Sequence, residues 1–158
     1  MNVHEQPSTS IAEMRTRVGQ VIGVSPWYEV TQDMIDRFSE VTDDHQFIHS
    51  DPVRAKAETP FGGTIAHGFL TLSLLSMLAR EVLPKLKDRA MGINYGFDRI
   101  RFMTPVKSGA RVRGRFTLTE TIDRAEKLIM FRYAVSIEIE GGAKPALTAD
   151  WLTLAVVE

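Results

Sequence analysis

Apolar residues follow a helical period in the first half of the chain and a strand period in the second. Thr31 is a typical N-cap, and the residues after it predict an amphipathic helix. One face of this helix carries Met34, Ile35, Phe38 and Val41. Asp51 and Pro52 predict a second helix, because aspartate caps well and proline is favoured at the first helical position. The segment from Thr59 to Gly63 then stops this short helix.

A third helix is predicted between Phe69 and Leu83, and its apolar residues cover most of its circumference. A helix that is apolar nearly all round must be buried nearly all round. Pro84 ends it, because proline cannot continue a helix. The sequence therefore predicts one long central helix that is covered on most of its sides.

Beyond this helix the period changes to two, which is typical of strands. The first long strand spans Met91 to Val106, and a slip in its alternation near Asp98 predicts a β-bulge. Three more strands follow, around residues 112–118, 129–139 and 146–156, with Gly141 and Gly142 as a hairpin signal. An earlier short strand is indicated within residues 17–24. Short connections make neighbouring strands antiparallel, so we expect a meander of four long strands.

These elements predict an α+β fold in which a curved antiparallel sheet wraps around the central helix. Long edge strands need protection, and pairing two sheets edge to edge in a homodimer supplies it. The chain has 158 residues, enough for one domain, which we place at residues 17–158. Residues 1–16 are polar and predict a flexible N-terminal tail.

Composition excludes several classes of function. The net charge is −1, so the basic excess of a nucleic-acid or membrane-surface partner is missing, and we expect neither partner. The chain has no cysteine, which excludes disulfides, thiolate metal sites and a cysteine nucleophile. The N-terminus has no apolar signal core, so we expect a cytoplasmic protein.

Polar residues that could do chemistry concentrate in the loop from Asp43 to Asp51. The simple interpretation is a solvated connector. Phe47 and Ile48 argue against it, because they should pull the loop inward and half-bury Asp44 and His49. An aspartate and a histidine placed in this way can hold a water between them and move its proton. The rival interpretation is a metal site that includes His45, but no metal-binding His spacing supports it, so we expect no metal.

A second candidate feature is His67-Gly68, at the start of the central helix. In a purely structural role, Gly68 allows close packing and His67 packs or caps the helix. In a functional role, the free backbone N–H groups at this helix start would stabilise a thioester or enolate oxygen. Ser76, two turns later, either bonds the carbonyl four residues earlier or touches substrate. A serine nucleophile is not expected, because no Gly-x-Ser-x-Gly motif is present.

These residues resemble the MaoC-like dehydratases, or (R)-specific enoyl-CoA hydratases, which have the hotdog fold. The resemblance rests on Asp44 to His49, on Ser50-Asp51-Pro52, and on residues 65–70, which read IAHGFL. Within this family, the sequences of residues 42–49 and 94–102 are most similar to the branch of nodulation protein N. One departure concerns the loop, which usually reads Asp-x-Asn-Pro-x-His, because Gln46 and Phe47 replace the Asn-Pro pair here.

The resemblance implies a role for each candidate residue. Asp44 is the base that activates water, and His49 holds the water and shuttles a proton. Gly68, with His67 beside it, offers its N–H to the thioester oxygen, and Ser76 matches a helix serine near the pair. The implied reaction is reversible hydration of a trans-2-enoyl-CoA to an (R)-3-hydroxyacyl-CoA, with the CoA thioester as substrate and no metal or redox cofactor. A homodimer is also implied. The alternatives are a hotdog thioesterase and a non-catalytic protein that binds acyl thioesters.

Overall fold

The computed structural model describes residues 7–158. The helices are α1 (Ile11–Thr16), α2 (Gln32–Thr42), α3 (Phe47–Ser50), α4 (Pro52–Glu58), α5 (Gly68–Ser73) and α6 (Leu75–Val82). The strands are β1 (Ser8–Thr9), β2 (Val21–Val24), β3 (Tyr28–Glu29), β4 (Lys85–Leu86), β5 (Arg89–Phe102), β6 (Arg111–Ala125), β7 (Leu128–Ile139) and β8 (Leu147–Val157). None of the helices in this part of the chain is long and apolar enough to cross a membrane.

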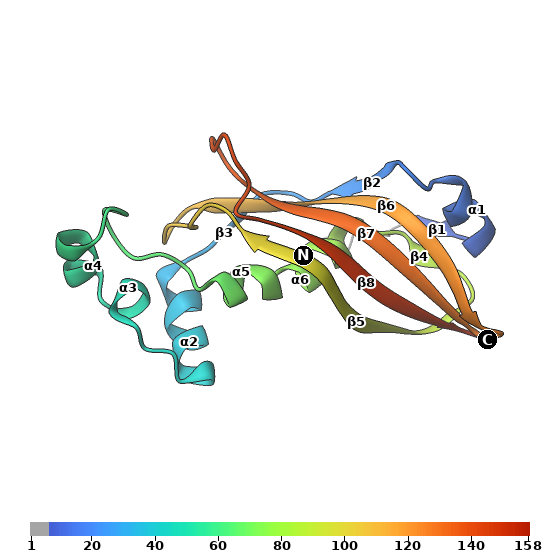
Figure 1. Ribbon diagram of the computed structural model, residues 1–158, viewed down its shortest axis with the longest axis horizontal. Coiled ribbons are helices and arrows are strands. Elements are labelled where there is room, and N and C mark those ends of the chain that lie inside the picture. Colours follow the sequence, from blue (N-terminus) through green and yellow to red (C-terminus); the bar gives the residue numbers. More distant parts are fainter. Residues whose placement is uncertain (1–6) are drawn as a thin grey trace.

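The main sheet is antiparallel throughout, with the strand order β2-β6-β7-β8-β5, and β3 also pairs with β6. It curves over α5 and α6, which lie along one of its faces, whereas α2, α3 and α4 lie beyond one end (Figure 1). The core between helix and sheet includes Leu75, Leu78, Phe116, Leu118 and Ile137, all of them buried. The α+β architecture with a curved antiparallel sheet is therefore confirmed.

The predicted meander is correct only for β6, β7 and β8. The preceding strand, β5, pairs with β8 and forms the far edge of the sheet. Its connection to β6 crosses the end of the sheet, held there by the bond from Ala66 N–H to the Val106 carbonyl (2.7 Å) and by that from Val30 N–H to the Ala110 carbonyl (2.8 Å). A short connection thus joins strands that are not neighbours.

The predicted bulge in β5 is confirmed. The register of β5 against β8 shifts between Asp98 and Arg101, and Arg99 has a positive φ of 38°. Arg99 also donates two hydrogen bonds to the Asp150 carboxylate on β8 (2.9 and 2.6 Å), which hold the bulged residue against the sheet.

Both predicted helix starts are confirmed by their caps. The Thr31 hydroxyl accepts from Met34 N–H, and the Asp51 carboxylate accepts from Arg54 N–H. The predicted apolar face of α2 is partly wrong, because Val41 is 85% exposed. This last turn of α2 extends past the end of the sheet, so only the part of the helix that includes Ile35 and Ser39 is buried.

The predicted central helix is present but differs in two ways. It is interrupted at Leu74, which separates α5 from α6, and it is not buried on most sides. Phe69 is 68% exposed, and Ser73 and Ser76 on the same stripe are exposed as well. Within a single chain the sheet covers one side of the helix and leaves the other open.

The segment expected as a flexible tail contains two elements in its described part, while residues 1–6 lie outside the described residues. Strand β1 pairs in parallel with β4, and α1 begins with a capping box between Ser10 and Glu13. Met14 on α1 is buried in the hydrophobic core. Sequence reasoning missed this ordered segment, which lies at the end of the sheet opposite to α2–α4 (Figure 1).

Candidate active site

The candidate loop is shaped by the end of α2 and by the short helix α3. Asp43 ends α2 in the left-handed conformation (φ 56°), which turns the chain sharply into the loop. Residue His49 lies on α3 and is fixed through its backbone, because its carbonyl accepts a hydrogen bond from the Gln32 side chain (2.8 Å). The neighbouring Ile48 carbonyl accepts from Ile65 N–H (3.0 Å). Elements from three parts of the chain therefore position His49.

The His49 imidazole is buried, with 7% of its surface exposed. Its Nδ1 lies 2.7 Å from the Ile65 carbonyl, which can only accept, so Nδ1 carries the proton. Nε2 is then left with a free lone pair. Burial lowers the pKa of His49 below its usual value, and the hydrogen bond to Ile65 opposes this shift only in part. The ring is therefore kept neutral and able to accept a proton.

The Asp44 side chain lies beside the buried histidine and is 52% exposed. Ligand atoms of Asp44, His49 and His67 all lie within 4.8 Å of one another. One water that makes two hydrogen bonds of about 2.8 Å can bridge groups at this separation. Phe47 and Ile48 are expected to half-bury both Asp44 and His49. His49 is buried, and Asp44 is about half exposed. An exposed carboxylate and a buried neutral imidazole thus lie near enough to each other for one water to bridge them.

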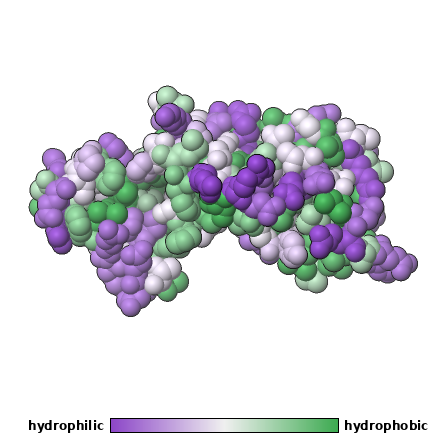
Figure 2. All heavy atoms as spheres, in the orientation of Figure 1, coloured by the Kyte–Doolittle hydropathy of each residue, from purple (hydrophilic) through white to green (hydrophobic). Residues whose placement is uncertain are grey.

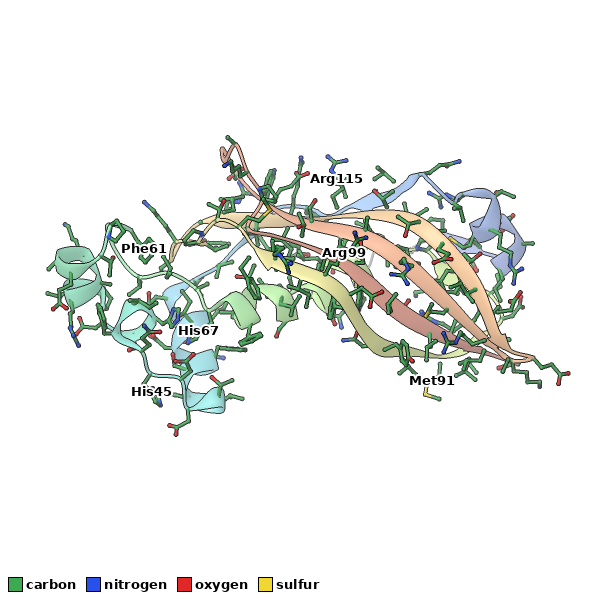
Figure 3. All side chains as sticks on the ribbon, in the orientation of Figure 1. His45, Phe61, His67, Met91, Arg99 and Arg115 are labelled. Carbon is green, nitrogen blue, oxygen red and sulfur yellow. The ribbon has the colours of Figure 1, made fainter. Side chains whose placement is uncertain are left out.

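His67 lies beside α2 (Figure 3). It is 2% exposed, and its ring stacks on that of His49 with a centroid distance of 3.8 Å. Its Nε2 lies 3.1 Å from the Asp44 carbonyl and 3.3 Å from the Ser39 hydroxyl. Since the carbonyl can only accept, Nε2 carries the proton. Nδ1 is then a buried acceptor that has no partner among the described residues.

Asp44, His49 and His67 also form a possible metal-binding group. The ring planes of the two histidines are only 26° apart and stacked. Stacked rings direct their nitrogens side by side, whereas the ligands of a tetrahedral zinc site converge on one point. His45, the third member of the rival metal site, instead points to Asp43 (3.3 Å). The arrangement favours proton transfer over metal binding.

Gly68 lies close to the histidine pair, and it lines with His49 a cavity of about 270 Å³. It is the first residue of α5, so its backbone N–H has no acceptor within the helix. A Cβ at this position would lie 3.0 Å from the ring of Phe102, which lines the same cavity. Glycine therefore avoids a tight contact here, because the Phe102 ring would have to shift to admit a Cβ.

Ser76 lies elsewhere. It is exposed on α6 and lines a different cavity, which shares no lining residue with the one at His49. Sequence reasoning also missed Phe102, Thr71 and Gln32, which line or support the site. Phe102 belongs to a strand pattern that indicates only core packing, and nothing local reveals that it faces Gly68.

Comparison with known proteins shows the family to which the chain belongs. The sequence matches the family described as MaoC like domain over residues 13–138. It is 54% identical to nodulation protein N of Rhizobium leguminosarum bv. viciae, over 92% of this chain and 90% of that protein. It is 40% identical to 3-hydroxyacyl-thioester dehydratase Z of Mycobacterium tuberculosis (strain CDC 1551 / Oshkosh), over 89% of this chain and 92% of that protein.

Among solved structures, the (R)-hydratase from A. caviae involved in PHA biosynthesis is similar. It has a TM-score of 0.68 and 26% identity, over 86% of this chain and 94% of that chain. The matched family segment includes the whole candidate site, from α2 to Phe102. The chain therefore belongs to the MaoC-like dehydratase family and has its hotdog fold.

Proposed function

We propose that this protein is a hydratase/dehydratase that adds water reversibly to a trans-2-enoyl-CoA to give an (R)-3-hydroxyacyl-CoA. The observation that carries the proposal is the Asp44 carboxylate within 4.8 Å of the buried His49 imidazole, whose pKa is lowered by burial. The relatives support it, since one is named as a 3-hydroxyacyl-thioester dehydratase and another as an (R)-hydratase. Nodulation protein N, at higher identity, carries no reaction in its name.

In the proposed reaction, a water held between Asp44 and His49 attacks C3 of the enoyl group. As the C–O bond forms, the electrons of the double bond move towards the thioester carbonyl, and Asp44 accepts a proton from the water. The Gly68 N–H donates to the carbonyl oxygen, where negative charge develops. Asp44 then gives up this proton, which is delivered to C2, so H and OH have both been added and the protein is unchanged. His49 orients the water through its free nitrogen, and the scheme uses no metal or redox cofactor.

The proposal is tested by the loss of enoyl absorbance when purified protein is mixed with crotonyl-CoA. Asp44→Asn removes the base and keeps the shape, and it should lower kcat by about 100-fold or more. Asp43→Asn is the matched control, because the neighbouring carboxylate is almost fully exposed and should not contribute. Equal activity in wild type and Asp44→Asn would refute the role of this base. Release of free CoA without hydration would instead assign a thioesterase, and binding without turnover an acyl-thioester-binding protein.

We also propose a homodimer in which a second copy covers the open edge of β5. This edge strand has 14 residues, and among residues 7–158 it pairs only with β8. Its exposed side chains include Met91, Tyr95 and Phe102, and Figure 2 shows apolar surface where Met91 protrudes. A long apolar edge of this kind attracts other strands unless a partner covers it. A second copy placed here would also cover the open side of α5, since Phe69 contacts Phe102.

A further inference from the structure

A second cavity, of about 510 Å³, lies between α6, α1 and the sheet. Its apolar lining includes Met14, Ala79, Phe131, Trp151 and Leu154. Trp151 is held in place by the hydrogen bond from its indole N–H to the Asn94 side chain (2.8 Å). Arg80, Lys85 and Arg89 also line the cavity, but its apolar side, fixed by Trp151, suits a hydrocarbon chain.

The helix that starts at Gly68 connects this cavity to the candidate active site. Leu74, between α5 and α6, keeps a right-handed helical conformation, so the two helices continue in one direction. From Gly68 to Ser76, which lines the second cavity, the helix advances roughly 12 Å. The exposed stripe of Phe69 and Ser73 runs between them along the open side of the helix. A chain whose thioester lies at Gly68 can follow this stripe to the cavity.

The far wall of the cavity is supplied by α1, which is firmly attached. Its N-terminal side is tied to β4, because Lys87 N–H donates to the Thr9 carbonyl (2.9 Å). Its C-terminal side is tied to β6, because Gly19 N–H donates to the Leu118 carbonyl (2.7 Å). Met14 is 1% exposed and lines the cavity between these two attachments. The matched family segment starts only at residue 13, so β1 and the first turn of α1 precede it.

We propose that Met14 is a specificity-determining residue that limits how long an acyl chain the protein accepts. The inference rests on the proposed function, because it takes the thioester to lie at Gly68. An extended chain spans roughly 1.2 Å per bond, so about ten bonds are needed to cover the 12 Å to Ser76. Chains shorter than this end before they reach α1, whereas longer chains enter the cavity and end against Met14.

The test compares turnover of trans-2-enoyl-CoA substrates from four to sixteen carbons, roughly a third to one and a half times that reach. Met14→Ala should raise kcat/KM for the longest chains at least several-fold relative to the four-carbon substrate, whose own value should stay the same. Met14→Phe should shorten the longest accepted chain. Met14→Val is the second enlarging variant, in case the alanine variant does not fold. Ile11→Ala is the matched control, because Ile11 packs against the core from the same helix without lining the cavity.

The outcomes separate this inference from the proposed function. An unchanged length profile in an active Met14→Ala or Met14→Val protein overturns the inference and leaves the hydratase assignment standing. An equal effect on all lengths, matched by Ile11→Ala, also overturns it, because α1 would then have only a structural role. If wild type turns over no enoyl thioester, the proposed function fails. Calorimetric binding of saturated acyl-CoAs of the same lengths to wild type and the Met14 variants then decides whether Met14 limits the chain.

Discussion

The chemistry at residue scale depends on one imidazole that is kept neutral. Burial lowers the pKa of His49, and the Ile65 carbonyl accepts its Nδ1 proton. The free Nε2 can therefore take part in proton transfer near neutral pH. Asp44, beside it, keeps half of its surface in contact with solvent, where water can be replaced after each turnover.

The lowered pKa of His49 predicts how activity depends on pH. Hydration of crotonyl-CoA should fall as the imidazole is protonated, so the acid limb of kcat/KM should be centred below pH 6.5, the ordinary value. A pH profile between about pH 5 and 8 measures it. An acid limb centred above 6.5 would contradict the neutral, buried histidine. His45, which is exposed, supplies the control, since His45→Gln should leave the profile unchanged.

Stability should respond to the same group. Below about pH 6.5 the unfolded chain protonates this histidine while the native state, with its lower pKa, does not. The unfolded state then binds more protons, so the free energy of unfolding falls as pH decreases towards the native pKa. Urea unfolding of wild type and His49→Gln should show a smaller slope in the variant over this window. If the free energy of unfolding depended on pH equally in the two proteins, His49 would not be the group responsible.

We expect His67 to position Asp44 and His49 without taking part in the reaction itself. Its N–H donates to the Asp44 carbonyl, and its ring supports that of His49. In His67→Phe an aromatic ring remains, but the donor is lost and the carbonyl is left without its partner. We expect kcat to fall while KM changes little, with a stability loss of about 1–3 kcal/mol. Turnover and urea unfolding are measured together, and a change in KM alone would indicate substrate binding instead of positioning.

Local signals in the sequence identified the Asp44–His49 pair but not its support. Both residues belong to one loop, and the apolar residues between them indicate that the loop turns inward. The stacking of His67 on His49 depends on how a segment 18 residues further on returns to the loop, which no local pattern encodes. The same applies to Ser76. The sequence predicts its position along the helix but not the cavity that it lines.

At element scale, helix α5 and strand β5 meet at a tight contact between Gly68 and Phe102. Periodicity predicted both elements but not that β5 pairs with β8, because strand order depends on long-range packing. Similarly, the Ser10–Glu13 capping box is a local signal, yet the burial of Met14 beneath the sheet is a tertiary result. Sequence alone therefore predicts elements better than it predicts their neighbours.

This contact predicts a rescue. In Gly68→Ala the new Cβ would lie 3.0 Å from the Phe102 ring and push it into the cavity that holds the reacting group. We expect kcat/KM to fall about tenfold or more, with a stability loss of about 1–3 kcal/mol from overpacking. Adding Phe102→Leu should relieve the clash and restore much of the activity, as measured with crotonyl-CoA. If Phe102→Leu does not restore activity to Gly68→Ala, the loss comes from a changed position of the residue 68 N–H and not from the clash with Phe102.

At the scale of the whole molecule, one chain leaves two neighbouring surfaces uncovered. One is the edge of β5, and the other is the exposed stripe of α5 that begins at Phe69. The acyl path from Gly68 runs along this stripe, so within one chain it has a wall on only one side. A second copy would supply the other wall and protect the edge strand at the same time.

Charged residues on the edge of β5 should therefore reduce both association and activity. Met91→Lys combined with Tyr95→Lys places two charges on the exposed edge, which disfavours strand pairing. Light scattering should show wild type at twice the chain mass and the variant at the chain mass. Turnover per chain should fall with it, and most steeply for long acyl chains, which need the second wall. Val53→Lys, which changes an exposed apolar residue on α4, away from this edge, is the control. A monomeric wild type of full activity would show that one chain builds the complete site.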